Sequence, residues 1–349
     1  MPRVTEPSFQ ILSPTFDAAT ATARFPYALG ELTFTETVRF PALVGRADAA
    51  ASPAFARLLD LAAAVLGVSY YKLLAPFRID ATALALSEAD RDFILDVYEN
   101  GLGEFFARNN LKRFGRLTLD VGPAPTRAAA PALGDKALVL IGGGKDSLVT
   151  LELLEAAGAD MTLFAVNPKG PIAASAERAN LPLLAAERVL DPEMLRLSKT
   201  EGFYNGHVPS TAINSMIASL AALLSGHNRI VLSNERSADE GNLVFDGRET
   251  NHQYSKSLGF ERRIAEMLAQ ATGGALSYFS LLRPYSEARI AGVFARGTRF
   301  DDVFSSCNRN FTQIPHQGPL WCGQCPKYHF VFLIFASHMS RDRLVGIFG

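Results

Sequence analysis

The stretch ALVLIGGGKDSLVTLELL, residues 137–154, decides the fold of this chain. Five apolar residues lead into three glycines, and Lys145, Asp146 and Ser147 then open a segment whose apolar residues recur with helical period. In an open parallel sheet, ligands bind where the carboxyl end of a strand meets the start of the next helix. Unpaired N–H groups and the helix dipole favour an anion there, so we expect this segment to bind a phosphate group.

The chain that follows alternates in the same way between strands and helices. Apolar runs at 160–168 and 229–235 predict strands, and patterns of helical period at 147–158 and 209–226 predict helices. Strands that are apolar throughout and separated by helices indicate a parallel sheet covered on both faces. We therefore predict an α/β fold with a parallel, Rossmann-like sheet.

Residues 1–125 form a separate block of different character. Residues 27–40 alternate apolar and polar side chains around Gly30, which predicts a half-buried strand or hairpin, and residues 53–111 have helical period. The residues that follow are rich in proline, alanine and glycine, which is typical of a linker. We predict a smaller N-terminal α+β domain, a linker and the parallel-sheet domain, at 1–125, 126–135 and 136–349.

Composition and charge limit the classes of protein to which this chain can belong. The 34 basic and 35 acidic residues nearly cancel, which argues against a nucleic-acid binder that neutralises many phosphates. The amino terminus lacks the charged-then-apolar pattern of a secretory signal, and the apolar run at 330–336 is too short to span a bilayer. Three cysteines fit no closed disulfide framework. We expect a cytoplasmic protein that binds neither nucleic acid nor a membrane.

The glycine loop fails two familiar phosphate-binding patterns. A Walker A loop that ended at Lys145 would need glycine at Val139 and a hydroxyl residue at Asp146. The dinucleotide fingerprint would need a glycine at Ser147. The remaining pattern, GGGKDS, resembles the S-G-G-x-D-S core of the PP-loop ATP pyrophosphatase superfamily, with Gly142 in place of the first serine. The alternative is an ordinary strand-to-helix turn with a capping serine.

This resemblance implies an adenine nucleotide alpha-hydrolase type of fold and a defined reaction. PP-loop enzymes cleave ATP between the α and β phosphates, transfer AMP to a carboxylate or carbonyl oxygen, and release pyrophosphate. Asp146 would help to hold Mg²⁺, and Lys145 would be a catalytic residue that stabilises charge on the leaving group. The loop would cradle the departing pyrophosphate through Gly142, Gly143, Gly144, Lys145 and Ser147.

Two later polar segments are predicted to complete the nucleotide site. Asn167 follows the second strand of the sheet, where PP-loop folds place the adenine and ribose; a simple Pro/Gly turn is the alternative. The strand at 229–235 ends in a dense polar cluster, which we expect to bind the cofactor through Ser233, Asn234, Glu235 and Arg236. Glu235 is a second candidate ligand for Mg²⁺, although these charges also suit a solvated loop.

Three cysteines form a candidate zinc site near the end of the chain. Cys322 and Cys325 have the C-x₂-C spacing of a zinc knuckle, and Cys307 supplies a third thiol. His316 or His329 could complete four ligands. The pattern departs from a full set of four cysteines, so a buried, metal-free thiol cluster is the alternative.

The combination of IGGGKDSLVTLELL, FAVNPKGPI, GHVPSTAINS, VLSNERSADEGN, NHQYSKS and WCGQCPK resembles the bacterial UDP-N-acetyl-muramoyl-L-alanyl-L-glutamate epimerase family, MurL. The resemblance implies that the terminal L-Glu of a UDP-linked muramoyl dipeptide is inverted to D-Glu for peptidoglycan synthesis, while ATP becomes AMP and pyrophosphate. The partners would be ATP and this UDP-muramoyl dipeptide, which the N-terminal block would help to grip. Members of this family are longer, so we expect a carboxyl-terminal piece to be missing here.

Inversion at a carbon centre needs a base and an acid on opposite faces, or one mobile group that serves as both. The polar segments at 200–215 and 251–257 supply four candidates: His207, His252, Tyr254 and Lys256. The sequence offers no basis for choosing among them.

Two rival functions fit parts of the same pattern. Another AMP-forming PP-loop enzyme, such as a ligase, an amidotransferase or an RNA-modifying enzyme, would keep the fold and change the acceptor. The near-zero net charge disfavours RNA, and the sequence has no amino-terminal cysteine or glutaminase block to supply ammonia. A non-catalytic ATP-binding regulator would need fewer polar groups than follow the three strands.

Overall fold

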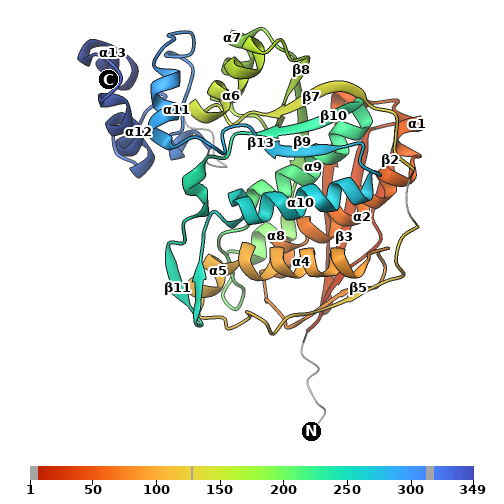
Figure 1. Ribbon diagram of the computed structural model, residues 1–349. Coiled ribbons are helices and arrows are strands. Elements are labelled where there is room, and N and C mark those ends of the chain that lie inside the picture. The colour runs from red at the N-terminus through yellow and green to blue at the C-terminus, as the bar shows by residue number, and fades with distance from the viewer. Residues whose placement is uncertain (1–6, 127–128, 312–317) are drawn as a thin grey trace. The chain divides into compact units, whose positions relative to one another are not determined.

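The computed structural model describes residues 7–126, 129–311 and 318–349, which form two compact units (Figure 1). The first unit consists of Met1–Gly134, Ala186–Asn228 and Ala238–Tyr278. The second unit consists of Asp135–Ala185, Arg229–Ser237 and Phe279–Gly349. The two units are therefore not consecutive along the chain, whereas the sequence suggested a simple division near residue 125. The domain boundaries themselves stay a prediction.

The strands of the first unit form a mixed sheet. β3 and β4 pair as an antiparallel hairpin with Leu29 opposite Leu32, and Gly30 takes the left-handed conformation that the tight turn requires (φ +61°). This confirms the hairpin predicted at 27–40. The strand order is β4-β3-β1-β5-β6, in which β1, β5 and β6 pair in parallel, and β2 pairs with β3. The bounds are β1 Phe9–Ile11, β2 Thr15–Asp17, β3 Thr22–Leu29, β4 Leu32–Arg39, β5 Arg78–Ala81 and β6 Thr118–Val121.

Helices cover the sheet of the first unit, and α9 packs on α2 while α10 packs on α2 and α4 (Figure 1). These contacts are the reason that the later segments join this unit. The Ser52 side chain caps α2, and Ser87 and Asp90 form a capping box at α4. The elements are η1 Pro41–Leu43, α1 Ala47–Ala50, α2 Pro53–Leu66, α3 Val68–Tyr71, α4 Glu88–Gly101, α5 Gly103–Arg108, α8 Pro192–Leu197, α9 Ser210–Ser225, β11 Leu243–Phe245, β12 Arg248–Thr250, η3 Tyr254–Lys256 and α10 Leu258–Ala271.

One helical stretch of the described chain, Pro53–Tyr71, is long and apolar enough to cross a membrane by composition alone. Within its most apolar window, 89% of the residues are buried inside the protein. Such burial is typical of a core helix in a globular unit.

The second unit contains the predicted strand–glycine–helix segment. Its strand order is β13-β10-β7-β8-β9, and β7 pairs in parallel with β8, with Leu140 opposite Phe164. The predicted α/β fold is confirmed. The chain passes from one unit to the other within β7, β9, β10, η2 and β13. The elements are β7 Gly134–Leu140, α6 Lys145–Ala156, β8 Met161–Val166, α7 Gly170–Ala179, β9 Leu183–Val189, β10 His227–Leu232, η2 Arg236–Asp239, β13 Ser277–Ser280, α11 Glu287–Phe294, η4 Asn308–Phe311, α12 Pro326–Ala336 and α13 Arg341–Phe348.

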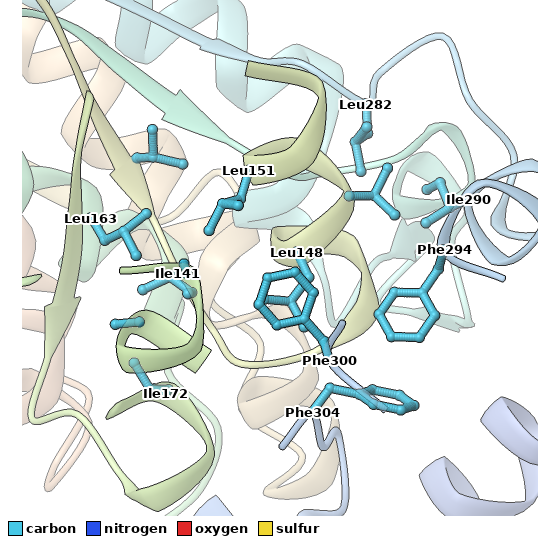
Figure 2. Packing of buried hydrophobic residues seen from close by; sticks show 14 of the residues in the cluster. Ile141, Leu148, Leu151, Leu163, Ile172, Leu282, Ile290, Phe294, Phe300 and Phe304 are labelled. Atoms are coloured by element: carbon cyan, nitrogen blue, oxygen red, sulfur yellow. The ribbon is translucent and has the colours of Figure 1, made fainter. Parts of the chain in front are cut away.

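Helix α6 is held by the apolar core of the second unit. Figure 2 shows Leu148 and Leu151 of α6 between Leu163 of β8 and Phe294 of α11. These side chains are almost fully buried, and each such burial stabilises the fold by about 1.5–3 kcal/mol. The start of α6, and with it the glycine loop, is therefore fixed on a packed element.

Candidate active site

Two glycines of the loop are required by the packing around them. Gly143 has φ +72°, and a Cβ there would lie 3.1 Å from the backbone of Pro171 and of Ile172. A Cβ on Gly144 would lie 2.5 Å from the Ser306 hydroxyl. Nothing lies within 4 Å of the corresponding position on Gly142, which is exposed. The position where this chain departs from the PP-loop pattern is therefore the one where a side chain could be accommodated.

The first turn of α6 has no side-chain cap within the described chain. Its N-cap is Gly144 in an extended conformation, and no side chain accepts a hydrogen bond from the first N–H groups. The Ser147 hydroxyl instead donates to the Gly144 carbonyl oxygen at 3.0 Å. The alternative of Ser147 as the helix cap is therefore wrong. Uncapped N–H groups at a helix start suit an anionic ligand.

Lys145 is held between two carboxylates in the second unit. Its ammonium lies 2.6 Å from Asp146 Oδ1 and also pairs with Glu287 Oε2, and its side chain is only 3% exposed. Burial alone acts to lower the pKa of Lys145, but the charges of Asp146 and Glu287 outweigh it and raise that pKa. Lys145 therefore stays charged and orients both carboxylates.

Glu287 is a candidate site residue that the sequence analysis missed. It lies in the first turn of α11, and 142 positions separate it from Lys145. The Asp146 and Glu287 side chains are 37% and 23% exposed, so both carboxylates are within reach of solvent. Two carboxylates around one ammonium leave one excess negative charge, and carboxylate oxygens are ligands that Mg²⁺ prefers. These residues therefore fit a Mg²⁺ site.

Two side chains of the polar cluster after β10, Asn234 and Glu235, already form hydrogen bonds within the protein. The buried Glu235 carboxylate accepts hydrogen bonds from the Ser237 amide and, at 2.7 Å, from the Ser237 hydroxyl. Asn234 donates to the Ser280 hydroxyl at 3.0 Å. This geometry favours Glu287 over Glu235 as the second carboxylate of a metal site.

Two further members of this cluster are open to a ligand. The Ser233 hydroxyl is buried and has no hydrogen-bond partner within the described chain. The Arg236 side chain is exposed. Because β10 is the neighbour of β7 in the sheet, these two residues follow a strand that lies beside the glycine-loop strand.

Asn167 follows β8 and lies in the loop that packs on the glycines. It is exposed and has φ +47°, a left-handed conformation that asparagine tolerates well. Because β7 and β8 are parallel, Asn167 and the glycine loop leave the same edge of the sheet. The role of Asn167 in binding adenine or ribose stays a prediction.

The four candidates for proton transfer belong to the first unit and differ in their surroundings. The Tyr254 hydroxyl donates to Asp96, which also pairs with Arg263 at 2.5 Å. Burial and the Asp96 charge raise the pKa of Tyr254 well above its ordinary value, which disfavours Tyr254 as a base. His252 and Lys256 are exposed.

His207 has the surroundings that best suit a proton-transfer group among these four. Its side chain is half-buried, and His207 directly follows the loop residues Asn205 and Gly206. Burial lowers the pKa of His207, and the charge of Glu104 opposes that effect. A partly buried imidazole can both take and give a proton, and a lowered pKa favours its neutral, basic form.

The three cysteines form one cluster in the second unit. Their sulfur atoms all lie within 4.8 Å of one another, and Cys307 Sγ lies 3.8 Å from Cys325 Sγ. The Cys325 amide donates to Cys322 Sγ and the Tyr328 amide donates to Cys325 Sγ, each at 3.3 Å. Burial raises the pKa of Cys307, whereas hydrogen bonds, first from the Gln324 amide, lower the pKa of Cys322 to about 7.

This cluster has the dimensions of a zinc site. Two Zn–S bonds of about 2.3 Å at a tetrahedral angle place their sulfurs about 3.8 Å apart. The amide hydrogen bonds stabilise thiolates, which are the form that binds zinc. His329 is exposed and lies outside the cluster, and His316 falls outside the described residues.

Comparison with known proteins identifies the family. Residues 3–281 match the family model of the MurL N-terminal domain, and residues 303–349 match that of the MurL C-terminal domain. The chain belongs to the MurL family. The first match contains the glycine loop and His207, and the second contains all three cysteines of the thiol cluster.

Relatives of known name agree with this membership of the MurL family. The chain is 43% identical over 98% of its length to a UDP-N-acetyl-alpha-D-muramoyl-L-alanyl-L-glutamate epimerase of Xanthomonas oryzae pv. oryzae, and spans 76% of that protein. It is 42% identical over its whole length to a Micromonospora protein of the same name, and spans 78% of it. The expected family is confirmed.

A solved structure has a much weaker likeness to this MurL chain. It is a predicted subunit of tRNA methyltransferase from Methanocaldococcus jannaschii, with a TM-score of 0.31 and 14% identity over 47% of this chain and 76% of that one. At this level the likeness carries no argument about function.

Proposed function

We propose that the chain is an ATP- and Mg²⁺-dependent epimerase that inverts the terminal L-Glu of UDP-N-acetylmuramoyl-L-Ala-L-Glu to D-Glu. The observation that carries the proposal is the uncapped glycine loop at α6, in a chain 43% identical to an epimerase of that substrate. The expected isomerase class is confirmed by the family. The use of ATP and Mg²⁺, the cytoplasmic location and the place in peptidoglycan precursor synthesis are parts of the proposal.

Activation by adenylation explains why an epimerase would need a pyrophosphate-binding loop. Removing the α-hydrogen beside a free carboxylate would put a second negative charge on a group that is already anionic. Transfer of AMP to the carboxylate oxygen releases pyrophosphate and gives a neutral acyl linkage, so the α-hydrogen becomes far more acidic. The α-carbon then loses its proton from one face and gains one on the other, and water cleaves the acyl-adenylate to product and AMP.

The described residues of the second unit suit the activation step. The N–H groups at the start of α6 would bind the departing pyrophosphate, and Gly143 and Gly144 let the loop pack closely against the protein behind it. Asp146 and Glu287 would hold Mg²⁺, which neutralises phosphate charge when it is bound. Lys145 keeps the two carboxylates in place because it pairs with both.

Zinc is a second proposed metal, with a structural role. Cys307, Cys322 and Cys325 would bind it as thiolates and connect the segment before η4 to the start of α12. The three sulfurs are already gathered within 4.8 Å, so binding would need little rearrangement.

One assay tests the proposed function against its rivals. The protein is incubated with ATP, Mg²⁺ and UDP-N-acetylmuramoyl-L-Ala-L-Glu in deuterated water, and AMP, pyrophosphate and deuterium at the glutamate Cα are measured. We expect all three, and the Asp146→Ala variant should release no pyrophosphate. AMP without deuterium would favour a PP-loop enzyme with another acceptor, and ATP binding without turnover would favour a regulator.

A further inference from the structure

A groove beside α11 is lined by residues of the second unit alone. Its volume is about 480 Å³, which lies within the range of small-molecule pockets. One wall comes from α6, the floor from α11 and the residues next to it, and a further wall from the residues after α12. We call it the α11 groove, and its lining includes Leu153, Tyr285, Arg289, Val293, Arg296 and His338.

The groove lies on the face of α11 that is turned away from the core. Ile290 and Phe294 of the same helix belong to the packed core (Figure 2). Arg289 and Arg296 are seven positions apart, so they share a different face and are separated by about 10 Å along the helix axis. A Cβ on Gly292 would lie 3.3 Å from the His338 ring, so the glycine between the two arginines lets His338 approach the helix closely.

The α11 groove is lined by three basic side chains and by no acidic one. Arg289, Arg296 and His338 are exposed, and none of them forms an ion pair with a described residue. Glu155 of α6 lies two positions after Leu153, and it pairs with Arg299 at 2.6 Å instead. The two guanidinium groups therefore leave two uncompensated positive charges beside a cavity, which suits a ligand with more than one negative charge.

The two arginines and the apolar wall indicate which kind of anion fits. The Arg289 guanidinium lies 4.4 Å from the centre of the Tyr285 ring, a cation–π contact that helps to hold it in place. A guanidinium is a planar fork of N–H donors that can bind two phosphate oxygens at once. Two such forks along one helix suit phosphate groups in a row better than a single carboxylate. Leu153 and Val293 offer apolar surface to the organic part of a ligand.

We propose that the α11 groove binds a small molecule that carries a diphosphate group, at a place separate from the glycine loop. The loop precedes α6, whereas Leu153 lies eight positions, or about 12 Å, further along that helix than Lys145. The diphosphate belongs either to a nucleoside diphosphate or to free pyrophosphate. Binding there goes beyond the proposed function and needs no turnover.

The experiment measures the binding of UDP by isothermal titration calorimetry in the absence of ATP and Mg²⁺. We expect the Kd to rise by about tenfold or more in Arg289→Gln and in Arg296→Gln, because each variant loses one charged fork. Arg341→Gln changes an exposed arginine at the start of α13 in the same unit, and as the matched control it should keep the wild-type Kd.

A second titration of UDP, with excess inorganic pyrophosphate present, distinguishes the two sources of the diphosphate. Competition by pyrophosphate would support a site that recognises the diphosphate alone. Binding of UDP that pyrophosphate does not weaken, but that the two arginine variants do, would support a site for a nucleoside diphosphate.

A further variant tests the place of binding without removing a charge. Ala288 lines the groove and is exposed, so Ala288→Phe puts a ring into the groove. We expect a loss of affinity comparable to that in Arg289→Gln. Wild-type affinity in Ala288→Phe, an equal loss in Arg341→Gln, or no binding of UDP and pyrophosphate to the wild type would overturn the inference. Citrate that binds as tightly as UDP would reveal a general anion surface and would overturn it as well.

Discussion

Lys145 and Glu287 form an ion pair inside the second unit, although 142 positions of sequence separate them. Glu287 thereby lies beside Asp146, which pairs with the same ammonium at 2.6 Å. The start of α6 and the start of α11 therefore present two carboxylates together. We interpret this pair, with the uncapped N–H groups of α6, as the metal and pyrophosphate site of the activation step.

Loss of the Glu287 carboxylate should weaken the response to Mg²⁺. In Glu287→Gln, the Mg²⁺ concentration that gives half-maximal AMP formation should rise by about tenfold or more, a change of about 1.4 kcal/mol in binding. Titration of AMP formation with Mg²⁺ measures this shift. Glu177→Gln on α7, an exposed glutamate of the same unit, is the matched control and should leave the titration unchanged. An unchanged midpoint in Glu287→Gln would refute the assignment.

A methyl group at Gly144 should obstruct the loop. The Cβ of Gly144→Ala would lie 2.5 Å from the Ser306 hydroxyl, so the loop must shift or the fold is strained by about 1–3 kcal/mol. We expect loss of pyrophosphate release and a lower midpoint in urea unfolding. Gly346→Ala is the control, because nothing lies within 4 Å of its Cβ position in α13. If Gly144→Ala were as active as Gly346→Ala, the described loop packing would be wrong.

Zinc should be present at about one atom per chain in protein purified without chelators. Cys322→Ser should lose the metal, whereas His329→Ala should keep it because His329 lies outside the thiol cluster. Removal of zinc should increase hydrogen exchange in residues 318–349, measured by mass spectrometry. Metal content near zero in the untreated protein would show that the cluster is metal-free.

Lys72 should make stability depend on pH in a defined direction. Because burial lowers the pKa of Lys72 to about 8 in the folded chain and its ordinary value is 10.5, the unfolded chain binds more protons between these limits. The free energy of unfolding of the wild type, relative to Lys72→Met, should therefore rise as pH increases from about 8 to about 10.5. Urea unfolding of the two proteins across this range measures the difference. A constant or falling difference would mean that Lys72 is not held at a lowered pKa.

Local sequence patterns predicted the parts of the fold that depend on neighbours along the chain. The alternation at 27–40 predicted the β3–β4 hairpin, and the apolar run before three glycines predicted β7 and α6. Local patterns do not predict that α9 and α10 join the first unit, because they do so through packing against α2 and α4. Helical period alone does not show which distant helix a face contacts.

In the candidate sites too, the sequence predicted only those features that depend on residues close together along the chain. The glycine loop and the cysteine spacing are local patterns, and the described structure has a close-packed loop and one thiol cluster at these positions. Glu287 and Lys72 lie in no local sequence pattern that marks a site. Their significance comes from partners far away in sequence, at Lys145 and at Asn205.

In the proposed reaction, inversion proceeds by AMP transfer to the glutamate carboxylate. The most direct test of this transfer is to follow ATP labelled at the α-phosphate, together with deuterium at Cα, while the wild type acts on UDP-N-acetylmuramoyl-L-Ala-L-Glu in deuterated water. We expect labelled AMP, pyrophosphate and deuterium in every inverted glutamate. Formation of ADP and inorganic phosphate, or inversion without ATP, would contradict it.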